Sequence, residues 1–151
     1  MELKTTIWQG NSFSDERGTL FFNNDFDLTA IKRCYQIEHP NTKIVRAWQG
    51  HKQEKKWFSV LSGSFLIALV QPDNWEKPSQ NLGVQKFVLK ADDNQVLFIS
   101  GGFANGMMAL ENNSKVMLYS NFTAKESAND NFRFDKNNWF DWESSLNKKK
   151  C

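Results

Sequence analysis

A polar segment between two apolar, β-rich runs constrains the fold of this chain more than any other feature. Residues 44–48 and 57–61 form the apolar runs, and the segment between them holds His51 and several lysines, ending at Lys56. The second run closes on a Ser-Gly turn. Charged side chains set between two strands are how a β-barrel directs polar groups into its own mouth. The segment therefore predicts strands that surround a polar cavity.

Short β-like runs recur along most of the chain, separated by Asp, Asn, Pro and Gly turn residues. Aromatic residues make up 14% of the sequence, which favours strands, where rings pack well on a pleated surface. Many short strands with few helical patterns indicate a sandwich or a barrel. The expected strands are 19–22, 31–37, 44–48, 57–61, 64–70, 85–89, 95–99, 107–110 and 115–121.

Only the C-terminal part has helical patterns. Thr123 and Glu126 have the spacing of a capping box that opens a short helix, and residues 139–146 predict a second helix. A chain of 151 residues is long enough for one domain with its own core. We expect that domain at residues 1–146, followed by a disordered basic tail at 147–151.

Charge and cysteine usage exclude several classes of protein. A net charge of +2 provides no global field for nucleic acid or membranes. The two cysteines, Cys34 and Cys151, form neither a disulfide framework nor a zinc-binding spacing. The N-terminus lacks the apolar core of a signal peptide, and we find no stretch long enough for a membrane span. These features predict a cytoplasmic protein.

Several motifs occur in an order that resembles a known enzyme family. They are 15–18 (DERG), 45–48 (VRAW), Lys56 seven residues before a glycine, 99–106 (ISGGFANG) and Tyr119 at the end of an apolar strand. This order resembles the dTDP-4-dehydrorhamnose 3,5-epimerases. Residues 31–37 and 46–52 look even more like the dTDP-4-keto-6-deoxyglucose 3,4-ketoisomerases, and both families are cupins. The resemblance implies an all-β, single-domain cupin jelly-roll β-barrel with short C-terminal helices. It also implies a homodimer in which an N-terminal strand crosses to the partner.

The reaction of these families removes a proton from a carbon next to a ketone. It requires a base, a group that holds the enolate oxygen and an acid that returns the proton. By resemblance, Lys56 holds the enolate and Tyr119 returns the proton. The resemblance also implies that Arg46 lies near the substrate and that Arg17 reaches a nucleotide in a partner subunit. Forked guanidinium donors suit a diphosphate.

The base is where this chain departs from the resemblance. Gln49 stands where the epimerases have a His, and a carboxamide cannot accept a proton at neutral pH. Of the two His that the ketoisomerase motif carries, only the second is present, as His51. Asn105 occupies another family His position. His51 is therefore the candidate base, and Gln49 and Asn105 are candidate substrate-binding residues.

Each candidate also has a structural interpretation. His51 can be a solvent-facing strand residue, and Lys56 can belong to a charged hairpin edge that blocks aggregation. Tyr119 can be a core tyrosine whose hydroxyl is satisfied. Trp48 can stack on a base or a sugar, although packing in the core is the better interpretation for any single Trp of this chain.

The sequence predicts neither a metal nor a cofactor. Cupin metal sites use three His and a Glu, whereas here only His51 and Glu54 are suitable, and Gln49 and Asn105 occupy the other positions. The leading hypothesis is a nucleotide-sugar epimerase or ketoisomerase that acts on a dTDP-4-keto-6-deoxyhexose for surface polysaccharide synthesis. One alternative is a non-catalytic cupin that binds a sugar nucleotide or a glycan. Another is a structural cupin without a ligand.

Overall fold

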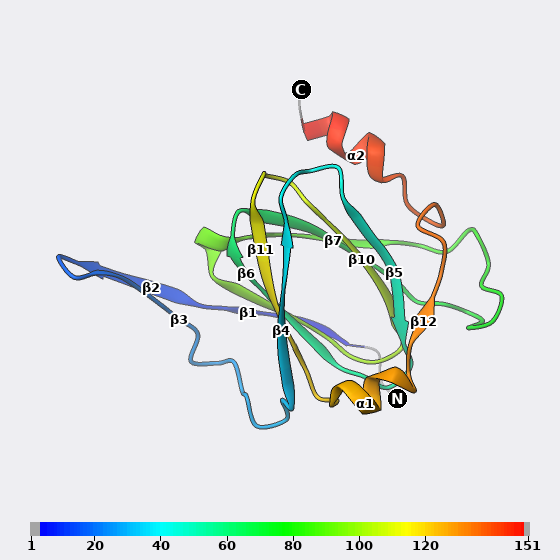
Figure 1. Cartoon of the computed structure of the whole chain (residues 1–151), viewed down its shortest axis with the longest axis horizontal. Coiled ribbons are helices and arrows are strands. Elements are labelled where there is room, and N and C mark those ends of the chain that lie inside the picture. Colours follow the sequence, from blue (N-terminus) through cyan, green and yellow to red (C-terminus); the bar gives the residue numbers. More distant parts are fainter. Residues whose placement is uncertain (1–3, 150–151) are drawn as a thin grey trace.

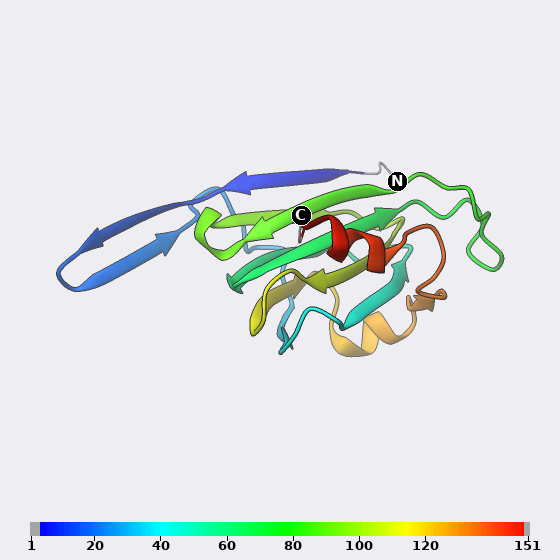
Figure 2. The ribbon, with the colours of Figure 1, turned by 90° about the horizontal axis from the view of Figure 1, so that it is seen from above.

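The computed structural model describes residues 4–149, with side chains described up to residue 145. Two five-stranded antiparallel sheets face each other (Figures 1 and 2). The first sheet has the order β1 (Thr5–Gln9), β9 (Gln95–Ile99), β6 (Lys56–Ser62), β11 (Ser114–Ser120), β4 (Arg33–His39). The second sheet has the order β12 (Phe132–Arg133), β5 (Val45–His51), β10 (Phe103–Ala109), β7 (Ser64–Val70), β8 (Gln85–Lys90).

A separate hairpin projects from this body. It consists of β2 (Asn11–Asp15) and β3 (Gly18–Phe22), and Figures 1 and 2 show it extending away from both sheets. Its apolar side chains Phe13, Leu20 and Phe21 are all more than half exposed. A β-ribbon with this much uncovered apolar surface has no core of its own within the chain.

Three short helical segments complete the described chain. They are a 3₁₀ turn η1 (Ala91–Asp93), α1 (Ala124–Ala128) and α2 (Trp142–Lys149). The expected capping box is present, because Thr123 accepts from the Glu126 backbone while the Glu126 side chain accepts from the Thr123 backbone. Neither α1 nor α2 has the length and the apolar surface that crossing a membrane requires.

The second helix lies further along the chain than we expected. It begins at Trp142 rather than at residue 139 and extends to Lys149, into the segment expected to be a disordered tail. Asp141 accounts for the later start, because its side chain accepts from the backbone N–H of Ser144, as an N-cap residue does. Residues 150 and 151 of that tail lie outside the described part of the chain.

Two apolar clusters contain many of the aromatic side chains. The cluster between the sheets includes Phe58, Phe65 and Leu118. The second cluster covers the outer face of the second sheet and includes Trp48 and Trp142. Strand residues alternate between the two faces of a sheet, so the inner face carries both this core and the polar site described below.

The fold confirms the expected all-β, single-domain class, and every expected strand overlaps an observed one. The sheets face each other as two layers rather than as a closed barrel. Three strands, β1, β2 and β12, are absent from the sequence-based prediction. Strand β2 is largely exposed and has no buried face, while β12 is two residues long, so neither has the apolar alternation by which strands are recognised.

Candidate active site

The register of β5 against β10 places three of the expected residues on the inner face. His51 pairs with Phe103 and Gln49 with Asn105, while Arg46 is opposite Met107. Phe103 and Met107 belong to the core between the sheets. A register irregularity between Asn105 and Met107 puts Arg46 and Gln49 on one face, although three positions along a regular strand would separate them.

The first sheet contributes the facing residues. Lys56 of β6 and Arg33 of β4 both pair with Ser120 of β11, and Tyr35 pairs with Leu118, a core residue. Residues paired directly across antiparallel strands share a face. Lys56, Arg33 and Tyr35 therefore point into the space between the sheets.

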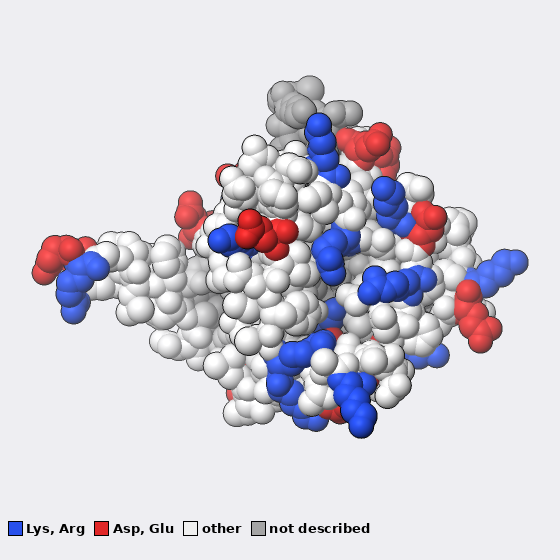
Figure 3. All heavy atoms as spheres, viewed as in Figure 1, with Lys and Arg blue, Asp and Glu red and all other residues white. Residues whose placement is uncertain are grey.

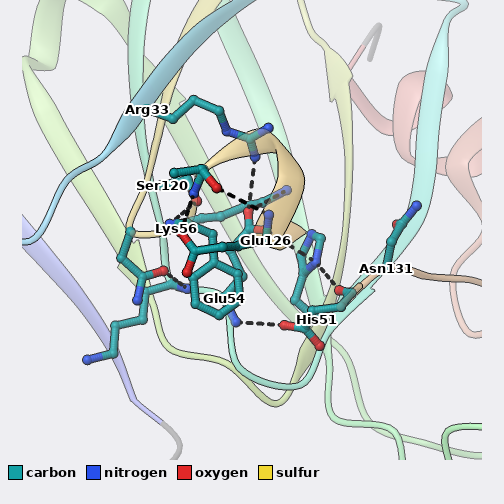
Figure 4. A network of polar contacts seen from close by, with 12 residues as sticks. Arg33, His51, Glu54, Lys56, Ser120, Glu126 and Asn131 are labelled. Atoms are coloured by element: carbon teal, nitrogen blue, oxygen red, sulfur yellow. Dashed lines mark hydrogen bonds and ion pairs between the residues drawn. The ribbon is translucent and has the colours of Figure 1, made fainter. Parts of the chain in front are cut away.

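Glu54 is the centre of this cluster, as Figure 4 shows. Its side chain is fully buried. One carboxylate oxygen lies 3.5 Å from Arg33 Nη2 and 3.9 Å from Lys56 Nζ, and the other lies 3.8 Å from His51 Nδ1. A buried carboxylate requires opposite charges nearby, and here three cationic or titratable groups surround it.

His51 is 3% exposed and is held from one side. Its Nδ1 lies 2.6 Å from the carbonyl oxygen of Asp130. Its Nε2 is buried and has no hydrogen-bond partner within the described chain. Burial lowers the pKa of His51, and Lys56 lowers it further, while Glu54 opposes both. The ring is therefore neutral at pH 7.

Lys56 is 1% exposed, and burial lowers its pKa to about 8, with Glu54 opposing the shift. Its Nζ donates to Gln49 Oε1 at 3.1 Å. An ammonium with a pKa near 8 remains mostly charged at pH 7 and can still give up a proton. The Gln49 side chain also donates to Asn131 Oδ1 at 3.5 Å, so its orientation is set from both ends.

A pocket of about 220 Å³ lies beside this cluster. Its lining includes Arg46, Gln49, Asn105 and Arg133. Asn105 is buried and donates to the Gln49 carbonyl at 3.2 Å. Figure 3 shows Lys and Arg side chains gathered on the face between β4 and β5. A larger pocket of about 840 Å³ lies over the outer face of the second sheet, beside α2, and contains none of the clustered residues.

Three expected residues lie outside the cluster around Glu54. Tyr119 pairs with Trp57 and packs edge-on against Phe26, with ring centroids 5.1 Å apart, on the outer face of the first sheet. Trp48 is 1% exposed and packs against Trp142 in the outer cluster. Arg17 is at the hairpin tip, where its 81% exposed side chain pairs with Asp15. Tyr119 and Arg17 therefore lie away from the pocket, whereas Trp48 contributes to its lining while it packs in the outer cluster.

Several residues of the cluster are absent from the sequence-based set. Arg33 and Tyr35 alternate with exposed residues along β4, a pattern visible in the sequence. Arg133 enters through β12, which is too short to predict. Asp130 makes its contacts at a sequence distance of 76 to 79 residues, for which the sequence gives no local signal.

A metal site is not formed by the described residues. Within residues 4–149, no three His, Cys, Asp or Glu side chains come together in a way that could hold an ion. His51 and Glu54 are neighbours, but Gln49 and Asn105, paired two residues further along β5 and β10, carry amide side chains.

Comparison with known proteins identifies the fold and the family. The structure resembles a dTDP sugar isomerase from Desulfovibrio desulfuricans G20, with a TM-score of 0.73, 17% identity and 95% of each chain covered. It resembles a dTDP-4-dehydrorhamnose 3,5-epimerase from Bacillus anthracis str. Ames, solved with TDP and PPi bound, with a TM-score of 0.69 and 17% identity over 91% of this chain and 84% of that one.

A ketoisomerase has the same fold. It is a mutant of a 3,4-ketoisomerase from Thermoanaerobacterium thermosaccharolyticum in complex with TDP-4-keto-6-deoxyglucose, with a TM-score of 0.66 and 20% identity over 99% of this chain and 96% of that one. No curated protein sequence matches the chain. The family model of dTDP-4-dehydrorhamnose 3,5-epimerase matches residues 4–150. The chain thus belongs to the dTDP-4-dehydrorhamnose 3,5-epimerase family of dTDP-sugar isomerases.

Proposed function

We propose that this isomerase acts on a dTDP-4-keto-6-deoxyhexose by removing a proton next to the ketone, in the synthesis of surface polysaccharide sugars. The observation that carries the proposal is the placement of a neutral, buried His51 and a buried Lys56 around one carboxylate, beside a pocket with two arginines. Enolisation requires a base and a fixed positive charge in a site with little water.

His51 is the base in this proposal. Its ring is neutral at pH 7 because burial lowers its pKa, and its Nε2 has no partner within the described chain. A neutral imidazole with an unpaired nitrogen can accept a proton. Gln49 takes no proton and instead orients the ketone or a sugar hydroxyl, together with Asn105.

Lys56 holds the developing enolate oxygen. A compact ammonium in a buried site stabilises an oxyanion strongly, and the contact with Gln49 Oε1 directs Nζ toward a residue that lines the pocket. Proton return then falls to Tyr35 rather than Tyr119, because Tyr35 is on the inner face. Burial raises the pKa of Tyr35, as does Glu54, which keeps the phenol protonated.

Arg46 and Arg133 bind the diphosphate, since both line the pocket and guanidinium groups bind phosphate oxygens in pairs. Arg17 reaches no group of the pocket in its own chain. We propose that the chain forms a homodimer in which the β2–β3 hairpin carries Arg17 to the nucleotide of the partner subunit. The exposed apolar side chains of that hairpin support a partner surface there.

The experiment is hydrogen exchange on the substrate. The protein is incubated with dTDP-4-keto-6-deoxyglucose in deuterated water, and the sugar protons are followed by NMR. Deuterium next to the ketone establishes enolisation and identifies the carbon. A Gln49→His variant is measured alongside, and we expect faster exchange if the position still faces the sugar. Complete absence of exchange in both proteins contradicts the proposed chemistry.

A second candidate function is a non-catalytic binder of sugar nucleotides. It is favoured by the fact that the pocket lining includes Arg46, Gln49 and Arg133, whereas His51 is not part of that lining. Thermal shift with dTDP and dTDP-glucose distinguishes the candidates when combined with exchange. At about 100 times Kd a ligand adds roughly 2.7 kcal/mol to stability. Binding without exchange identifies the binder, and absence of both indicates a structural cupin.

A further inference from the structure

Asp130 connects the segment between α1 and β12 with the turn between β5 and β6. It is 7% exposed and lies between α1 and β12. Its carboxylate accepts hydrogen bonds from the backbone N–H groups of Lys52, Gln53 and Glu54, each at 2.8 Å. Bonds from consecutive amides to one ionised carboxylate are short and strong. They fix the turn that connects β5 with β6 and thereby the position of Glu54.

The main chain of the same residue acts on His51. The Asp130 carbonyl is 2.6 Å from His51 Nδ1, and a carbonyl can only accept a hydrogen bond. Glu54 Oε1, a second acceptor, lies 3.8 Å from the same nitrogen. The hydrogen of the neutral ring is therefore on Nδ1, which leaves the lone pair on Nε2.

Helix α1 fixes Asp130 itself. The Asp130 backbone donates to Ser127 O at 3.0 Å, and Thr123 and Glu126 cap the start of the helix. Lys32 ties Glu126 to the body of the protein through an exposed ion pair. The helix is short and ends two residues before Asp130, so its end is tied by a backbone hydrogen bond to the residue that holds the β5–β6 turn.

We propose that Asp130 is a positioning residue that selects the Nδ1–H form of His51, so that Nε2 is free to accept the proton of the substrate, and that holds Glu54 among its three partners. The kinetic part of this inference rests on the proposed function, whereas the ring form does not. A residue with a purely structural role would hold the turn equally well without determining which nitrogen of His51 carries the hydrogen.

The direct test is long-range proton–nitrogen NMR of the ¹⁵N-labelled full chain at pH 7. The chain has two histidines, so a His39→Leu variant assigns both rings at once. We expect the Nδ1–H form for His51 in the wild type. An Nε2–H form or a charged ring in the wild type overturns the inference, whatever the activity of the protein.

Two variants extend the test. Asp130→Asn keeps the size and the carbonyl but weakens the hold on the three amides, and Asp135→Asn is its matched control, since Asp135 caps the backbone N–H of Asn137 at an exposed site. We expect His51 in Asp130→Asn to lose its single ring form. Turnover should fall roughly 10- to 100-fold, the range found for residues that orient metal-bound His, while dTDP affinity stays unchanged.

The pH profile provides the readout that a structural role would not change. Lys56, Glu54 and Asp130 are the charged groups that act on the pKa of His51. A displaced turn changes their distances from the ring, so it must shift the acid side of the plot of rate against pH. An unchanged acid side and an unchanged ring form in a folded Asp130→Asn, identified by its thermal unfolding, contradict the inference. Failure of substrate exchange in the wild type with the expected ring form would contradict only the proposed function.

Discussion

The two histidines of this chain are both buried but have different surroundings: His39 is the last residue of β4, and His51 is the last residue of β5. His39 is 1% exposed, and neither ring nitrogen has a hydrogen-bond partner within the described chain. It packs edge-on against Phe65, with centroids 5.4 Å apart. Arg33, at the other end of the strand, is six residues or ~20 Å away and faces the His51 cluster.

Burial alone therefore does not make a base. Burial lowers the pKa of both rings, so both are neutral at pH 7. Of the two, only His51 has a hydrogen-bond acceptor on one nitrogen and a carboxylate within 4 Å of its ring. The space between the sheets therefore has an end with the charged cluster around Glu54 and an end lined by apolar side chains such as Phe65, and the residues that we propose as catalytic lie at the charged end.

Loss of Lys56 should have the largest effect on the charged end. Lys56→Met keeps the chain length of the side chain but leaves Glu54 with only Arg33 and His51. Breaking a buried ion pair from one side costs about 3–5 kcal/mol, so we expect a loss of about 3 kcal/mol in urea unfolding. Exchange on the substrate should fall roughly 100-fold, the effect of losing one oxyanion donor.

The double variant Lys56→Met/Glu54→Gln sharpens this result. Once the carboxylate is neutral, the missing ammonium matters less, so more than half of the lost stability should return. Additive losses in the double variant would show that Lys56 and Glu54 do not interact. The matched control is Lys55→Met, because Lys55 is exposed and its bond to Asn121 Oδ1 comes from the main chain.

A pair of tyrosine variants tests which face of the first sheet takes part in the reaction. Tyr35 is on the inner face and Tyr119 on the outer face of the same sheet. We expect Tyr35→Phe to slow substrate exchange roughly 10-fold, less than a sole proton donor would, because Lys56 can also return a proton. Tyr119→Phe should leave the rate unchanged. The opposite ranking, measured by NMR, would mean that the outer face takes part in the reaction.

The smallest expected effect concerns the apolar end. His39→Leu removes two buried, unpaired polar atoms, and one such atom costs about 1–3 kcal/mol, so the variant should gain roughly 1 kcal/mol at pH 7. The folded-state pKa of His39 is below the unfolded value, through burial and then Arg46. Wild-type stability must therefore fall as pH drops below about 6.5.

The same measurement has a clear opposite outcome. In His39→Leu the acid-side loss should be smaller, though not absent, because His51 contributes with the same sign. Urea unfolding between about pH 5 and 7.5 gives both curves. A variant that is less stable at pH 7 would indicate a partner for His39 that the structure does not contain.

Strand positions could be predicted because apolar alternation and turn residues are local signals. The direction of side chains near the site could not be predicted, because it depends on the pairing register of neighbouring strands. Two irregularities, at Asn105/Met107 and at Lys115/Val116, shift the pairing, and a one-residue slip reverses every side chain that follows. The resemblance implied that Tyr119 faces the substrate, whereas the pairing of β11 with β4 and β6 places it on the outer face.

Only some of the residues that form the site could be predicted from the sequence, for a related reason. His51, Lys56, Gln49 and Arg46 lie within one local segment, so their grouping could be predicted. Asp130 and Arg133 join it through contacts across most of the chain. Such long-range contacts arise from the pairing of β12 with β5 and from the bonds of Asp130 to the β5–β6 turn, and no periodic pattern in the sequence reports them.

The most direct test of the account compares the two histidines in one reaction. Wild type, His51→Asn and His39→Asn are incubated with dTDP-4-keto-6-deoxyglucose in deuterated water at pH 7, and deuterium next to the ketone is followed by NMR. The account predicts exchange in the wild type and in His39→Asn, and a loss of roughly 100-fold or more in His51→Asn, as expected for a general base. Equal exchange in wild type and His51→Asn would contradict it.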